Sequence, residues 1–233
     1  MLMRMKSPSV APRRGRPPRD SATALSRSRV LQEALALTDE EGIEEVSMRK
    51  LARRLGVDPM SLYNHVDNKD AILDGITELI LASAEFPAPT SDLRTDLREM
   101  ARAFRRALLR HPRAAPLVLT RQLSSSQALM PTEIVLTTLR RAGLSPDQSV
   151  HAMRTVLAFL IGTLMREVHA GPTFGVGDTE SIRARRAELE DSGLPMIAEA
   201  APYLAACDHE AEFEFGLRVL LEALDAELAR MES

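Results

Sequence analysis

The stretch GVDPMSLYNHVDNKD, residues 56–70, places a glycine and an Asp-Pro step between two short apolar patterns, and it constrains the fold more than any other feature. Before it, apolar residues recur at helical spacing over residues 48–55, so we predict a helix that Ser47 caps and Gly56 ends. Asp58, followed by proline, supplies a capping acceptor and a fixed φ for the start of another helix. Two short helices joined by a turn containing glycine form a helix-turn-helix motif.

The rest of the chain also has helical patterns and no convincing strand. A first helix is expected after Ser26 or Ser28, ending at Gly42, and a fourth apolar pattern covers residues 72–80. Beyond residue 84 the helical patterns continue, with breaks expected at Pro112 and Pro116, at Pro131, from Gly143 to Pro146, and within residues 170–178. We therefore predict an all-α fold with a flexible basic arm (1–23), a helix-turn-helix domain (24–83) and a larger helical domain (84–233).

The helix that begins after Asp58 carries more hydrogen-bonding groups than a core helix needs. Leu62 and Val66 fall on its inward side. A recognition helix enters the major groove of DNA by its N-terminal residues. We interpret the outward residues as a DNA-reading face: Pro59, Met60, Ser61, Tyr63, Asn64 and His65.

Charge is unevenly distributed along the chain, although the net charge is only -3. Basic residues crowd the first 30 positions and return on the outward side of the helix after Ser47, whereas the segment from Asp208 onward is mostly acidic. A basic end favours nucleic-acid phosphates. The alternative interpretation is that short helices joined by glycine turns, with a solvated basic face, have no role in DNA binding.

The sequence MRKLARRLGVDPMSLYNHVDNKDAILDGI, residues 48–76, resembles the DNA-binding domain of the tetracycline-repressor family of transcriptional regulators. The Leu-Tyr-x-His-Val core and the Asn-Lys step occur at the family's spacing, and the resemblance covers about residues 24–83. It implies that Arg49 reads a guanine edge, a bidentate contact that discriminates between bases by ~1 to 3 kcal/mol.

The resemblance also implies roles for the neighbouring residues. Pro59, Met60 and Ser61 match the first turn of the recognition helix, which contacts bases. Phosphate contacts are expected from Tyr63, His65 and Lys69. The remaining predicted DNA-binding residues are Ser47, Lys50 and Asn64. The family's namesake has tryptophan at the position of Asn64 and glutamine at that of Pro59, so its operator sequence is not transferable.

The sequence RRGRPPR, residues 13–19, raises a second DNA hypothesis. Its Arg14-Gly-Arg16-Pro core resembles an AT-hook, in which an extended backbone places two arginines in a narrow A·T minor groove. The alternative is a disordered tail that attracts DNA without sequence preference. Either arrangement raises affinity in a salt-dependent way.

Two long apolar segments, residues 146–170 and 210–230, stand out in the larger domain. The second contains F-x-F-G-L, which resembles the closing helix of the tetracycline-repressor class of C-terminal domain. In that class the two helices pair with their symmetry mates as a four-helix bundle, so we predict a homodimer. The predicted interface residues are Val156, Leu160, Phe213, Leu217, Leu221 and Leu224. The alternative is that these side chains form an intramolecular core.

No catalytic or metal-binding arrangement is recognisable. His151 and His169 lie ~27 Å apart on one predicted helix, too far to share a metal ion. The sequence lacks a phosphate-binding glycine loop. Cys207 is the single cysteine, so neither an intramolecular disulfide nor a cysteine-rich zinc site can form. We predict no enzyme activity, no metal and no cofactor.

A small-molecule effector fits the larger domain better, because helical domains of this size hold pockets between their helices. The predicted apolar lining is Met100, Phe104, Leu108, Met153 and Phe159, with polar groups from Arg121, Gln122 and Glu167. By the resemblance, Val118 and Glu85 occupy the positions of a magnesium-ligating and a drug-contacting histidine. No strong response to magnesium-tetracycline is therefore expected.

Taken together, these features predict a sequence-specific transcriptional regulator, namely a repressor that an unknown small molecule releases from a palindromic operator in double-stranded DNA. The alternative function is nonspecific DNA packaging or scaffolding through the basic arm. No apolar run suggests an export signal or reaches the ~20 residues that span a bilayer, so a cytoplasmic location without membrane contact is expected.

Overall fold

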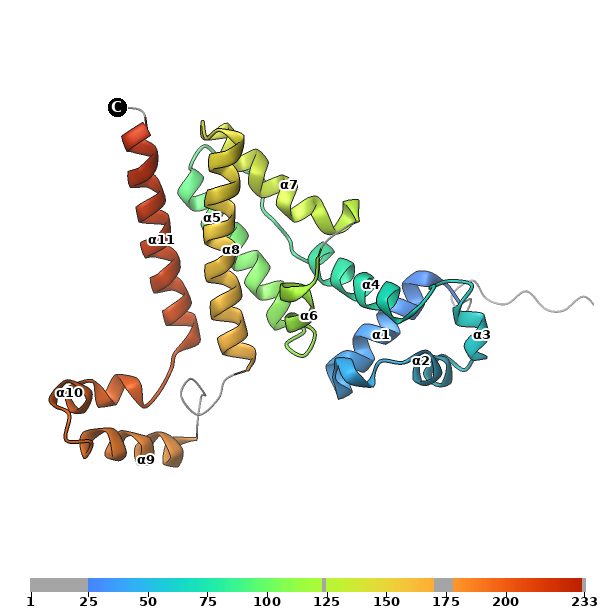
Figure 1. The fold of residues 1–233 in the computed structure, drawn as a ribbon, viewed down its shortest axis with the longest axis horizontal. Coiled ribbons are helices and arrows are strands. Elements are labelled where there is room, and N and C mark those ends of the chain that lie inside the picture. The colour runs from blue at the N-terminus through green and yellow to red at the C-terminus, as the bar shows by residue number, and fades with distance from the viewer. Residues whose placement is uncertain (1–24, 123–124, 170–177, 232–233) are drawn as a thin grey trace, which may run out of the picture.

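The computed structural model describes residues 25–122, 125–169 and 178–231, and the regular elements in these ranges are all helices (Figure 1). The N-terminal part contains α1 (Arg27–Glu41), the 3-10 turn η2 (Ile43–Glu45), α2 (Met48–Leu55), α3 (Pro59–Leu62) and α4 (Lys69–Ala82). The remainder contains α5 (Leu93–Leu109), α6 (Ala115–Thr120), α7 (Ser126–Arg141), α8 (Pro146–Val168), α9 (Thr179–Glu190), α10 (Pro195–Leu204) and α11 (His209–Met231). The predicted all-α fold is confirmed.

The predicted helix starts of the N-terminal part are confirmed in detail. The side-chain oxygens of Ser26, Ser47 and Asp58 accept hydrogen bonds from the backbone N–H groups of Arg29, Lys50 and Met60, respectively. The Asn68 side chain caps α4 in the same way. Gly56 ends α2 in the left-handed conformation, at φ 67°, which a residue with a Cβ rarely adopts.

One predicted helix break is wrong. Pro131 lies inside α7, five residues after its first residue, Ser126. Proline removes one backbone hydrogen bond and costs a helix interior ~3 kcal/mol in isolation. Here α7 packs against α4, α5 and α8, and Pro131 itself faces a cavity between these helices. Tertiary packing therefore offsets the local preference.

Helix α4 belongs to two packing units at once. It packs against α1 on the N-terminal side and against α5, α6 and α7 on the other. The buried core is continuous through it, running from Val30 and Leu37 in α1 through Ile76 and Ile80 in α4 to Val118 in α6. A second buried cluster joins α5, α7, α8 and α11. Any displacement of α4 must therefore be shared by both parts of the protein.

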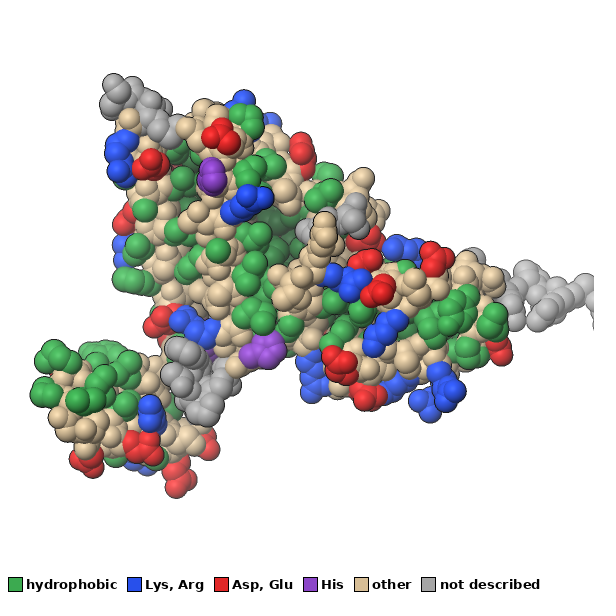
Figure 2. All heavy atoms as spheres, in the orientation of Figure 1, with side chains coloured by type: hydrophobic (Ala, Val, Ile, Leu, Met, Phe, Trp, Pro, Cys, Tyr) green, Lys and Arg blue, Asp and Glu red, His purple; other side chains and the backbone are tan. Residues whose placement is uncertain are grey.

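Helices α9 and α10 form a hairpin whose two members pack chiefly against each other. In Figure 1 the hairpin projects from the lower end of α8 and α11. Figure 2 shows hydrophobic side chains gathered on its surface, and the exposed members are Leu194, Met196, Tyr203 and Leu204. Among the described helices, none is long and apolar enough to cross a membrane.

The contact between α1 and α4 depends on a glycine. A Cβ added at Gly75 would lie 2.4 Å from Cδ2 and 2.5 Å from Cδ1 of Leu31, a side chain that is only 2% exposed. We expect Gly75→Ala to lower the free energy of unfolding by about 1 to 3 kcal/mol, because the buried Leu31 side chain must shift within the core to admit the added Cβ. Chemical denaturation of the purified chain measures this difference.

Two further variants test the cause of that loss. Within one chain, an added Cβ at the exposed Gly162 in α8 meets nothing within 4 Å, so Gly162→Ala should leave the stability of the single chain unchanged or raise it by up to about 1 kcal/mol. Combining Gly75→Ala with Leu31→Ala should cost less than the sum of the single changes, since the shortened side chain makes room. An unchanged stability in Gly75→Ala would contradict the packing argument.

Candidate DNA interface and effector cavity

The predicted reading face is solvent-exposed and its anchors are buried. Leu62 is fully buried and Val66 is 4% exposed, whereas Met60 and Tyr63 are 70% and 47% exposed. Pro59 and Asn64 are exposed, and Ser61 and His65 are half-buried. Helix α3 lies beside α2 at the end of the molecule farthest from α11 (Figure 1). Large apolar side chains exposed on a four-residue helix favour contact with a partner surface over a role in the core.

Two of the four basic residues on α2 are already paired within the protein. The Lys50 Nζ atom lies 2.6 Å from Glu41 and 2.7 Å from Glu45, and the side chain is only 18% exposed. Hydrogen bonding to Glu41 and then to Glu45 raises the pKa of the Lys50 ammonium. Arg54 likewise pairs with Glu33 and Glu40 of α1. These two cations fasten α2 to its neighbours, so Lys50 is poorly placed for the DNA contact predicted for it.

The cations that remain available lie around the reading face. Arg49 and Arg53 are exposed on α2, and Lys69 is exposed at the first position of α4. In the described ranges, none of the three has a carboxylate within ion-pair distance. Arg53 is not among the residues that the sequence predicts for DNA binding. It is exposed, and it differs from the neighbouring Arg54 in having no ion-pair partner among the described residues. Ser47 serves as the helix cap. Arg14 and Arg16 lie outside the described residues.

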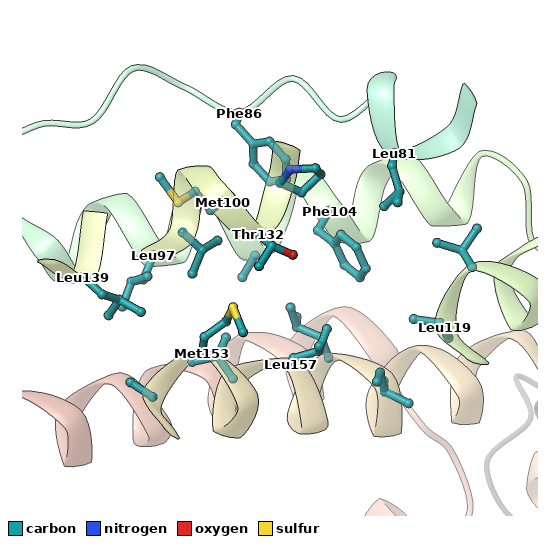
Figure 3. A pocket seen from close by; sticks show the side chains of 18 of the residues that line it. Leu81, Phe86, Leu97, Met100, Phe104, Leu119, Thr132, Leu139, Met153 and Leu157 are labelled. Atoms are coloured by element: carbon teal, nitrogen blue, oxygen red, sulfur yellow. The ribbon is translucent and has the colours of Figure 1, made fainter. Parts of the chain in front are cut away.

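A cavity of about 240 Å³ lies within the larger domain (Figure 3). Side chains from α5, α7 and α8 form most of its wall, and Phe86 from the segment after α4 closes one side. Of the predicted lining residues, Met100, Phe104, Arg121 and Met153 do line it. Val156 and Leu160, which the sequence assigns to the dimer interface, also face this cavity.

Four residues predicted to contact the effector do not line this cavity. Leu108 is fully buried in the core that includes α4. Phe159 stacks on Phe213 with ring centroids 6.0 Å apart. Glu167 receives two hydrogen bonds from Arg105, at 2.9 and 3.1 Å, and Gln122 borders a separate small surface pocket. The sequence identified two of the three helices that form most of the wall, α5 and α8, but none of the lining residues of α7.

The polar character of the cavity is concentrated in one side chain. Arg121 follows the last residue of α6, its Nε lies 2.5 Å from Asp74, and its Nη2 lies 3.2 Å from Asp70, both on α4. Hydrogen bonding to Asp74, followed by Asp70, raises the pKa of the guanidinium. A cavity residue is thus in direct contact with the helix that also packs on the DNA-reading part.

The positions assigned to histidines in the namesake of the resembled family are not equivalent here. Val118 lines the cavity with an apolar side chain, and Glu85 borders a different surface pocket beside Ser83 and Arg110. Within the described ranges, no group of three or more His, Cys, Asp or Glu side chains could hold a metal ion. Cys207 is half-buried, and burial is the main cause that raises the pKa of its thiol.

The predicted dimer residues are largely inside a single chain. Leu160 is 6% exposed, and Phe213, Leu217 and Leu221 are each 1% exposed in the core formed with α5 and α7. Val156 and Leu224 are half-buried. The alternative interpretation, in which these side chains form an intramolecular core, is therefore correct for the four buried residues. The exposed apolar residues on α11 are instead Phe215 and Val219, at 63% and 46%, whereas the partly exposed Leu157 of α8 lines the cavity.

Both parts of the chain match known protein families. Residues 30–76 match the family described as bacterial regulatory proteins, tetR family, and residues 86–228 match the tetracyclin repressor-like C-terminal domain. A protein named HTH-type transcriptional regulator, from Saccharopolyspora erythraea, is 31% identical over 91% of this chain and 90% of its own length.

Two further relatives cover most of both chains. The tetracycline repressor protein class D of Escherichia coli is 30% identical over 89% of this chain and 92% of its own length. Among solved structures, the TetR family protein ActR of Streptomyces coelicolor, in complex with actinorhodin, superposes with a TM-score of 0.77. Its sequence identity is 25%, and the alignment covers 88% of this chain and 99% of that one.

The different surroundings of the two lysines predict different effects on DNA binding. Replacing Lys69 with methionine should flatten the log-log salt dependence of binding to a random duplex by about 0.9, the loss of one phosphate contact. Replacing Lys50 with methionine should change that slope less, because Glu41 and Glu45 already neutralise this cation. Fluorescence anisotropy of a labelled duplex between about 50 and 200 mM salt measures both slopes. An equal change in the two variants would contradict the assignment.

Proposed function

Because the chain belongs to the tetracycline-repressor family of transcriptional regulators, we propose that it is a homodimeric repressor that a small molecule releases from a palindromic operator. The family match covers both the DNA-binding and the C-terminal parts, so the chain is a ligand-responsive DNA-binding regulator. Nonspecific DNA packaging is not supported. Since its proposed target is the bacterial chromosome, we place the protein in the cytoplasm.

The observation that best supports repression relieved by a ligand is the position of α4. This helix begins beside the reading face at Lys69, and its last turn carries Leu81, which lines the cavity. A molecule that changes the cavity can therefore act on the DNA-reading part through one rigid element. The related ActR was solved in complex with actinorhodin, which supports effector binding in this chain's cavity as well.

We propose residues 24–83 as the DNA-binding domain and residues 84–233 as the effector-binding and dimerisation domain. In the proposed dimer, α8 and α11 of each copy face their symmetry mates, and the outward apolar residues of α11 in this interface are Phe215 and Val219. The proposed interface therefore uses exposed residues and not the four buried residues that the sequence predicts for it. A two-fold interface uses the same patch on both copies, so every apolar contact is made twice.

The proposed operator is a palindrome, and half-site spacing tests it. Two copies of α3 related by a two-fold axis require half-sites roughly one helical turn, ~34 Å, apart. Sequences selected from a random duplex pool should contain such a repeat. Inserting about five base pairs between the halves should abolish tight binding in a mobility-shift assay, because one half-site moves to the opposite DNA face. Tight binding to a single nonpalindromic site, indifferent to the insertion, would refute the proposal.

Charged substitutions on the outward face test the dimer without disturbing the core. The double variant Phe215→Glu/Val219→Glu should sediment as a monomer, because four carboxylates would meet across the two-fold axis. Tyr203→Glu in α10 is the matched control: Tyr203 is 83% exposed but lies outside α8 and α11, so its variant should remain dimeric. Circular dichroism checks that the variants stay helical. A folded double variant that still sediments as a dimer would exclude this interface.

A further inference from the structure

The cavity is almost entirely apolar, with one charged side chain. Among the described residues that line it, only Arg121 is ionisable, and only Arg121 and Thr132 carry a nitrogen or oxygen in the side chain. A cationic ligand would find no carboxylate in this wall, and burying an unpaired charge is costly. An anionic group, in contrast, could pair with Arg121, which lines both this cavity and the small surface pocket that also contains Asp74. The wall therefore favours an acid over a base.

Arg121 is already held by α4, through carboxylates that are easy to release. Asp70 and Asp74 are four residues apart, so both lie on the same side of the helix. Their side chains are 79% and 46% exposed, compared with 24% for Arg121. Water can solvate both carboxylates as soon as the guanidinium leaves them, and such exposed pairs contribute little net stability.

The geometry leaves Arg121 a donor for a ligand. Its hydrogen bonds to the described residues use Nε, which donates to Asp74, and Nη2, which donates to the side chain and the backbone carbonyl of Asp70. None of these bonds uses Nη1. A guanidinium carries five N–H donors in a planar fork that matches a carboxylate in two places. An acid inside the cavity would compete in a less polar medium than the two exposed aspartates, where its attraction to Arg121 is stronger.

We propose that the effector is a largely apolar molecule with one acidic group, and that this group takes Arg121 away from Asp74 and Asp70, thereby freeing α4. The proposal rests on the ligand-responsive function described above and defines both the class of effector and the contact that transmits its binding. Because coupling between sites is reciprocal, DNA that stabilises the Arg121–α4 contact should weaken acid binding by the same factor, typically about 5- to 150-fold.

Matched probes test the chemical class without DNA. The probes are naphthalene and anthracene carboxylic acids, each paired with its methyl ester and its aminomethyl counterpart, and titrated calorimetrically into the full chain. We expect at least one acid to bind about tenfold or more tightly than its ester, which corresponds to one hydrogen bond to a charged group. The aminomethyl compounds should bind more weakly than the acids.

Two variants test whether the preference for the acid over its ester depends on Arg121. In Arg121→Met the acid and its ester should bind alike, whereas Arg106→Met, which removes an exposed arginine of α5 outside the cavity wall, should keep the preference. If no acid exceeds its ester, if an aminomethyl compound binds most tightly, or if Arg121→Met keeps the preference, the proposal is wrong.

A second measurement tests whether the acid replaces Asp74 as the partner of Arg121, or whether Asp74 has only a structural role. Removing the competing carboxylate in Asp74→Asn should tighten acid binding several-fold and weaken binding to the selected DNA site, within the same range of about 5- to 150-fold. Glu78→Gln is the matched control, because Glu78 lies one turn later on α4 and pairs with Arg27 instead. Unchanged or weaker acid binding in Asp74→Asn would contradict the proposal that the acid and Asp74 compete for Arg121.

The proposed operator binding and the proposed acidic effector can be refuted independently of each other. If no sequence-selective DNA site is found, the proposed operator function fails, while the preference for acids remains measurable in the isolated protein. If a site is found but the methyl esters release it as well as the acids do, the function stands and the exchange at Arg121 is excluded.

Discussion

Helix α4 packs between two sets of helices, and this packing joins the two parts of the protein. On one side Gly75 allows the helix to approach Leu31 of α1, and on the other Leu81 reaches the wall of the cavity. The buried core passes through α4 without interruption. Since close-packed interiors transmit displacement instead of absorbing it, this packing supports the proposed coupling between the larger domain and the reading helix.

Polar contacts surround that apolar connection. Asp39 of α1 lies 2.8 Å from His111, which precedes α6, and Arg113 donates to the backbone carbonyl of Glu40. Arg121 holds the first two turns of α4. Ion pairs between partly exposed groups contribute little free energy individually but have defined geometry. They are therefore suited to setting the relative position of two parts that a shared core already holds together.

The same principle explains why so few cations are available at the reading face. Carboxylates of α1 and η2 neutralise Lys50 and Arg54, which stabilises the arrangement of α1, η2 and α2. Arg49, Arg53 and Lys69 remain exposed for phosphate or base contacts. The four cations of α2, which look equivalent in the sequence, thus divide into two that hold helices together and two that remain exposed. The division depends on which acidic side chains the fold brings within reach.

Local structure could be predicted from the sequence: the caps at Ser26, Ser47 and Asp58, the turn at Gly56, the long helices and the resemblance to a family of regulators. These features depend on residues within a few positions of one another, which propensity and spacing describe well. Which face of each helix is buried depends instead on how the helices pack against one another. The spacing of Leu217 and Leu221 fits either a dimer interface or an intramolecular core, and the structure places both in the core. Pro131 would be expected to break an isolated helix, but α7 continues through it because three other helices pack against α7. Contacts between residues far apart in the chain resolve such choices, because burial and ion pairing depend on neighbours that local spacing does not specify.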